Sequence, residues 1–208
     1  MAYYDSITLG RNLTQEEMTY NAWQFHDYFT HLGFTVESIC GMLGNIQWES
    51  HIDPAKKNDN SAWGLIQWHP PTSLTNWCSA NNYTWYDGDK QALLVYRELF
   101  PVPTDPYDTS GRWTYDSTHG YTYSPDQFKV LTDYDVATGS YFYQRERAGD
   151  DTLPKRMEYA ADWYEIFTGE EPPHPPHPPT PPHPPIGGSN KPLYLYVCKR
   201  FKRRKGIL

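Results

Sequence analysis

Cysteine is scarce in this sequence, with Cys40, Cys78 and Cys198 standing far apart among 208 residues. This number and spacing give no disulfide framework. Cys40 falls beside the apolar face of a predicted helix, so we expect it in the core; a Cys40–Cys78 bridge is the alternative. A cysteine nucleophile is disfavoured because no histidine or other base stands in a motif relation to these residues. No pattern indicates a metal or cofactor site, so none is expected.

Long apolar runs are also lacking. The sequence has no stretch of about 18 apolar residues, so it predicts no transmembrane helix. Its first residues, Met-Ala-Tyr-Tyr-Asp-Ser, have neither the charged start nor the apolar centre of a signal peptide. We therefore expect synthesis in the cytoplasm without such a peptide.

Positive charge is scarce outside the last part of the chain. Residues 189–208 hold seven lysines and arginines and no acidic residue, whereas the preceding residues hold 11 against 25 acidic ones. An acidic body with a short basic tail is not the profile of a nucleic-acid-binding domain, so no nucleic-acid partner is expected. The tail suits a protein partner, an anionic polymer or a membrane surface.

Aromatic residues are abundant, at 16% of the sequence with 18 tyrosines and 8 tryptophans. Such side chains suit both a packed core and a carbohydrate-binding cleft, and composition does not separate the two. Most of the remaining pattern is helical. Helix starts are predicted at Thr14 (a capping box with Glu17), Thr35, Ser73, Asp87, Ser124 and Asp135. The helix from Asp135 is predicted to run through Arg145, and a last helix over 153–167 to end at Gly169.

The other segments divide the chain into a body, a linker and a tail. Residues 1–13 and 101–123 are predicted to be irregular, and residues 63–68 to form a short strand or turn. From 170 to 185 a Pro-Pro-His repeat predicts a stiff polyproline II spacer, in which His174, His177 and His183 are solvated rather than metal-binding. We therefore predict a mostly α domain over 1–169, a linker over 170–188 and a basic aromatic tail over 189–208.

Glu49 is the strongest candidate for chemistry. Apolar residues at helical spacing predict a buried helix after Thr35, and Glu49 lies near its C-terminal end, beside Trp48. The negative end of the helix dipole and a neighbouring aromatic ring both favour an uncharged carboxyl group. A carboxyl group that keeps its proton near neutral pH is what a glycosidic general acid requires.

The surrounding motifs resemble a known superfamily. Glu49-Ser50, a proline at 54, and then Ala62-Trp-Gly-Leu-Ile-Gln67 followed by Pro70 resemble the signature of lytic transglycosylases and goose-type lysozymes. Over residues 12–169, the run Ile39-Cys-Gly-Met-Leu-Gly-Asn-Ile-Gln-Trp-Glu-Ser50 and the later Tyr141-Phe-Tyr-Gln-Arg-Glu-Arg147 are similar to the phage tail lysozymes. These are wall-degrading domains at the tail tips of phages that infect Gram-positive bacteria.

This resemblance implies a lysozyme-like α+β fold, with a small β lobe, and a set of site residues. Glu49 corresponds to the catalytic acid, and the Gly64–Gln67 segment lines the sugar cleft. Gln67 is then expected to bind an N-acetyl group or a water, and Trp63 and Trp68 to stack on sugars or to pack in the core. Gly64 permits close approach of backbone or substrate. The resemblance places Tyr141 and Tyr143 behind Glu49.

Further roles near this site stay open. A tyrosine hydroxyl could orient the Glu49 carboxyl group, while Arg145 is expected in a structural ion pair. Asp53 and Asp59 are the carboxylates nearest to Glu49 in the sequence, but no motif selects either, and Asp53 before Pro54 fits a turn.

The resulting hypothesis is a glycosidase that cleaves the β-1,4 bond between N-acetylmuramic acid and N-acetylglucosamine in peptidoglycan. It would act from a phage tail tip, with phage tail proteins or anionic wall polymers as partners of the basic tail. The alternatives are a free endolysin, lytic transglycosylase chemistry that yields a 1,6-anhydro product, and an inactive glycan-binding tail component. Intact Glu49 and Gln67 disfavour the last of these.

Overall fold

The structure is a computed structural model that describes residues 3–58, 61–102, 112–146 and 150–169. The predicted linker over 170–188 and tail over 189–208 lie outside the described residues, as do Asp59 and Cys198. None of the described helices is both long and apolar enough to cross a membrane.

The described chain is mostly helical, with one small two-stranded sheet, which confirms the predicted fold class. The helices are α1 (Ser6–Leu9), α2 (Gln15–His31), α3 (Val36–Ser50), α4 (Thr72–Ala80), α5 (Gly88–Leu99), α6 (Pro125–Lys129), α7 (Tyr134–Tyr141) and α8 (Leu153–Thr168). A π-helix over Phe142–Glu146 continues α7, and a short 3-10 helix over Asp150–Thr152 precedes α8.

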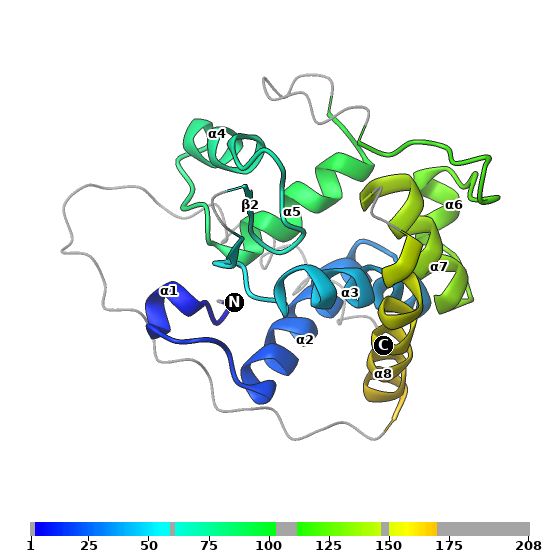
Figure 1. Ribbon diagram of the computed structural model, residues 1–208, viewed down its shortest axis with the longest axis horizontal. Helices are drawn as coiled ribbons and strands as arrows, with labels where there is room; N and C mark the ends of the chain where they lie inside the picture. Colours follow the sequence, from blue (N-terminus) through cyan, green and yellow to red (C-terminus); the bar gives the residue numbers. More distant parts are fainter. Residues whose placement is uncertain (1–2, 59–60, 103–111, 147–149, 170–208) are drawn as a thin grey trace, which may run out of the picture. The chain divides into compact units, whose positions relative to one another are not determined.

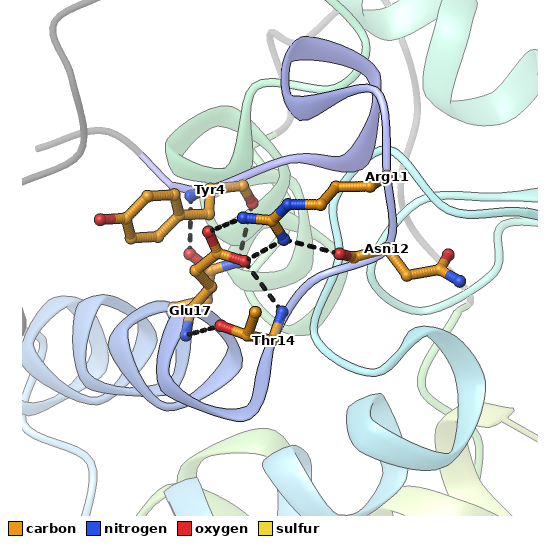
Figure 2. Close-up of polar contacts among 6 residues, drawn as sticks. Tyr4, Arg11, Asn12, Thr14 and Glu17 are labelled. Carbon is orange, nitrogen blue, oxygen red and sulfur yellow. Dashed lines mark hydrogen bonds and ion pairs between the residues drawn. The ribbon is translucent and has the colours of Figure 1, made fainter.

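Side-chain caps fix several helix starts where the sequence predicts them. Thr14 and Glu17 form a reciprocal capping box at the start of α2, and Thr35 and Asp87 cap α3 and α5. Figure 2 shows that Arg11 also binds Glu17, with Nη2 2.6 Å from Oε1. This hydrogen bond from Arg11 is the main cause that lowers the pKa of Glu17 to about 2. The start of α2 is therefore held by both a cap and an ion pair.

Four details of the predicted elements were wrong. Residues 6–9 form α1, capped by Asp5, where the sequence predicted irregular structure. Helix α4 follows Pro71 and has no side-chain cap, so Ser73 does not begin it. Asp133, not Asp135, caps α7, because its carboxylate accepts from the backbone N–H groups of residues 135 and 136. The α-helical turns there end at Tyr141, and a π-helix takes their place.

Helix α3 lies at the centre of the packing, with α7 and α8 beside it (Figure 1). The close approach requires glycine at position 44, where a Cβ atom would lie 2.4 Å from the backbone oxygen of Arg156 and 3.0 Å from Ala160. Cys40 is in the core as predicted, and it and Cys78 are both buried and free of a disulfide. This close packing fixes α3 against α8.

The small sheet pairs β1 (Lys57–Asn58) with β2 (Ala62–Trp63) in antiparallel register, with Lys57 opposite Trp63. The Lys57 ammonium lies 3.9 Å from the centre of the Trp63 ring. Just after β2, the backbone N–H of Trp68 donates to the carbonyl oxygen of Trp63 at 2.9 Å, which turns the Gly-Leu-Ile-Gln segment back on itself. This is the small β lobe that the resemblance implies.

Candidate functional site

Glu49 lies in the last turn of α3, just before His51 ends the helix in a left-handed conformation. Its side chain is 20% exposed, and its Oε1 accepts a hydrogen bond from Arg156 Nη2 at 2.5 Å. Arg156 comes from α8 and is itself buried, and its Nη1 also donates to Asn45 Oδ1 at 3.1 Å. A fixed guanidinium group therefore sets the position of the Glu49 carboxyl group.

This environment is more polar than the sequence predicts. The sequence predicts that the helix end and Trp48 favour an uncharged Glu49 carboxyl group, whereas the structure gives this group a buried arginine as its partner. Trp48 is instead 42% exposed, and its ring centre lies 5.9 Å from the Arg156 guanidinium carbon. No sequence motif predicts the contact with Arg156, because this residue lies 107 positions from Glu49 in the chain.

Gln67 has a left-handed backbone conformation, with φ 49°. Its Nε2 donates to the carbonyl oxygens of Gly64 at 2.9 Å and Lys56 at 3.3 Å. Its Oε1 is buried and accepts no hydrogen bond from the residues that the structure describes. The amide is thus held by the turn through its nitrogen, and the oxygen keeps its full capacity to accept.

Gly64 is required by the same turn. Its φ is 82°, and a Cβ atom there would lie 2.7 Å from Gln91 Oε1. That oxygen accepts from the backbone N–H of Leu65 at 2.7 Å, so Gln91 supports the turn from behind. The close neighbours of Gly64 are protein atoms, which accounts for the glycine without a substrate contact.

The two tryptophans of this segment have different surroundings. Trp63 is half-buried, with its ring centre 4.8 Å from that of Trp85. Trp68 is 2% exposed and belongs to the core, which was the alternative to stacking on a sugar. Its Nε1 donates to Glu98 Oε1 at 2.9 Å.

The two tyrosines of the late motif have different surroundings. Tyr141 is fully buried, and among the described residues its hydroxyl group has no hydrogen-bond partner, so no tyrosine bond orients the carboxyl group from this position. Burial raises the pKa of Tyr141 well above its usual range. Tyr143 instead stacks on His119, with ring centres 4.0 Å apart. Arg145 forms an ion pair with the buried Glu98, as the sequence analysis favoured.

Glu146, the last residue of the π-helix, was missed as a site residue. With Gln67 and Arg145 it lines a pocket of about 260 Å³, whose other lining residues are Ile66, Trp68, His69 and Arg112. The pKa of Glu146 is raised to about 7, chiefly by burial; Arg145 lowers it, and the charge of Glu49 contributes to the rise. The Arg-Glu-Arg run contained this residue, but helical periodicity did not show which of its side chains faces the pocket.

Asp53 takes no part in this pocket. It is buried, and its Oδ1 accepts from the backbone N–H groups of Ala55 at 2.9 Å and Ser6 at 3.2 Å. It therefore stabilises the turn after α3 and ties α1 to it.

Comparison with known proteins agrees with the motifs and the fold. The family model described as phage tail lysozyme matches residues 20–167. Morphogenesis protein 1 of Bacillus phage B103 is 28% identical over 170 residues, which cover 76% of this chain and 42% of that protein. The chain thus spans less than half the length of that relative. With most of its length matched, it belongs to the phage tail lysozyme family.

Proposed function

We propose that this protein cleaves the β-1,4 bond between N-acetylmuramic acid and N-acetylglucosamine in peptidoglycan, with Glu49 as the general acid. The observation that carries the proposal is the site at the end of α3. The Glu49 carboxyl group lies 2.5 Å from Arg156 Nη2, and Gln67 lines a pocket together with Glu146. Membership of the phage tail lysozyme family supports the same substrate.

In this reaction Glu49 gives its proton to the glycosidic oxygen while the bond from that oxygen to the muramic C1 breaks. Gln67 Oε1 accepts a hydrogen bond from the N–H of a substrate N-acetyl group, which positions the sugar. The attacking group is a water in a hydrolase, or the substrate's own 6-hydroxyl in a transglycosylase.

The test is digestion of purified peptidoglycan by the full chain, by Glu49→Gln, and by Glu165→Gln as a matched control on the exposed face of α8. Glu49→Gln is expected to fold and to lose at least about 10²-fold in rate, the usual size of a general-acid contribution. Glu165→Gln is expected to keep the wild-type rate. A Glu49→Gln rate within a few-fold of wild type would refute the assignment.

The products distinguish the alternatives. Mass spectrometry of the released fragments separates reducing ends, formed by hydrolysis, from 1,6-anhydro ends, formed by transglycosylation. Binding without any cleavage would identify an inactive glycan-binding component.

We also propose that the protein is part of the virion and acts at the tail tip. The family and the phage morphogenesis relative support this location. Detection of the chain in purified particles, with antibody label at the tail end, is the expected result. A chain found only in the lysate would favour a free endolysin.

A further inference from the structure

Two buried oxygen atoms that accept no hydrogen bond belong to residues of one pocket. They are Oε1 of Gln67 and Oε1 of Glu146, and the absence of a partner holds for the part of the chain that the structure describes. Leaving a buried polar atom unpaired costs about 1–3 kcal/mol. The turn holds Gln67 through its nitrogen, so the Gln67 oxygen has no part in that turn.

The position of Glu146 follows from the π-helix. Residues 142–146 depart from the α-helical repeat of α7, and local π turns are frequent at functional sites. Gln144 on this turn is anchored, since its Nε2 donates to the carbonyl oxygen of Tyr123 at 2.8 Å. Arg145 is anchored to Glu98. Glu146 thus directly follows two anchored residues of the same turn.

The charges that face Glu146 come from three packed helices and from its own turn. Glu49 lies on α3, Glu98 on α5, Arg156 on α8, and Arg145 on the π-helix, while Arg112 and His69 line the same pocket. Both principal cations already have carboxylate partners: Arg156 binds Glu49, and Arg145 binds Glu98. Within the described residues Glu146 therefore has no ion-pair partner of its own, and burial without one favours the form that carries a proton.

We propose that Glu146 is a second acid–base group of the cleft, which together with Glu49 holds and recovers the catalytic proton. This inference rests on the proposed glycosidase function. Its support is the pocket that Glu146 shares with Gln67, the unpaired Oε1 of Glu146 and the binding of Arg145 and Arg156 to other carboxylates. The pKa of Glu146, raised to about 7 chiefly by burial, agrees with a group that gains and loses a proton under working conditions.

The proton balance of the cycle closes. Glu49 gives one proton to the glycosidic oxygen as the bond to C1 breaks, so the leaving sugar departs as an alcohol. The nucleophile, a water or the 6-hydroxyl, forms its bond to C1 and releases one proton. The Glu49–Glu146 pair takes that proton, and the two groups end the cycle with the proton with which they began. No metal or redox partner is required by this balance.

The experiment compares the full chain with Glu146→Gln, Glu146→Asp and the control Glu165→Gln on peptidoglycan from pH 5 to about 9. With wild type, activity should fall as the pH rises through about 7, where the pair loses its proton. Glu146→Gln should lose about 10²-fold in rate, as an acid–base group does, and its remaining activity should lack this fall. Glu146→Asp keeps a titratable group, so it should be slowed and yet retain the fall.

A second measurement reports on the proton without any turnover. The wild-type chain with ¹³C at the glutamate carboxyl carbons should show one carboxyl group titrating near pH 7. That signal should be missing in Glu146→Gln and kept in Glu165→Gln. Because glutamine has nearly the shape of a protonated glutamate, Glu146→Gln should also melt cooperatively.

The outcomes separate the two proposals. A wild-type chain that cleaves no peptidoglycan overturns the glycosidase function, and the role of Glu146 in it. Cleavage by wild type with an unchanged rate and pH profile in Glu146→Gln overturns only the role of Glu146. A slower Glu146→Gln that keeps the fall near pH 7, with its carboxyl signal still present, also overturns that role, because the change is then merely structural.

Discussion

Replacing Arg156 by methionine tests how strongly the cleft depends on one buried cation. Methionine keeps the apolar stem but removes the donors to Glu49 Oε1 at 2.5 Å, Asn45 Oδ1 at 3.1 Å and Thr152 Oγ1 at 3.2 Å. Removing one partner of a buried ion pair costs about 3–5 kcal/mol. The Glu49 side chain is 20% exposed, so water can solvate its carboxylate in the variant. The expected loss of stability is therefore at the lower end of this range, about 3 kcal/mol.

A double-mutant cycle isolates the part of this loss that belongs to the charge of Glu49. In a Glu49→Gln background no carboxylate is stranded, so Arg156→Met should cost only about 1–2 kcal/mol, the loss of the two neutral acceptors. The expected coupling between positions 49 and 156 is therefore about 1–2 kcal/mol.

Urea denaturation, followed by tryptophan fluorescence on the full chain, gives the free energies of unfolding for this cycle. In a thermal melt, Arg156→Met should lower Tm by roughly 6–12 °C for a chain of this size. The control Lys155→Met removes the neighbouring exposed ion pair to Glu158 and should leave Tm nearly unchanged, because solvent screens such pairs. A coupling energy below about 0.5 kcal/mol would refute the inference that Arg156 sets the position of the Glu49 carboxyl group.

Two further predictions concern the ends of the body. Glu17→Gln keeps a capping side chain but loses the ion pair to Arg11, so it should cost at most about 1 kcal/mol at pH 7. Because the pKa of Glu17 is lowered to about 2, this difference should persist above about pH 4.5 and vanish as the pH falls toward 2; a constant difference across acid urea melts would contradict it. A chain ending at Gly169 should melt cooperatively and digest soluble glycan fragments at the full rate, but should bind intact walls less well and in a salt-dependent way. If digestion of soluble fragments falls as much as binding to intact walls, residues 170–208 support the cleft.

Local signals in the sequence predicted much of the fold. The capping box at Thr14 and the N-caps at Thr35 and Asp87 act within one helical turn, so they are readable without knowledge of the tertiary structure. The errors lie where tertiary packing decides. The π-helix after Tyr141 follows no distinct hydrophobic repeat, and α4 begins after Pro71 without a cap.

The candidate site was predictable only as far as its motifs extend. Glu49 and Gln67 were selected by local patterns, but their partners come from distant segments. Arg156 reaches Glu49 across 107 residues. Glu146 shares a pocket with Gln67, 79 positions before it in the chain. No periodicity connects such pairs, because the contact depends on how segments far apart in the chain pack together.

Glu98 links the two walls of the pocket. Its Oε1 accepts from Trp68 Nε1 at 2.9 Å, on the β-lobe side, and its Oε2 accepts from Arg145 Nε at 2.9 Å, on the π-helix side. One buried carboxylate on α5 thus anchors both segments that carry the unpaired oxygens of Gln67 and Glu146. Breaking one of two buried hydrogen bonds to a charged group is costly, so Glu98 should keep both segments in place. Positioning of the two acceptors is therefore built into the core of the domain.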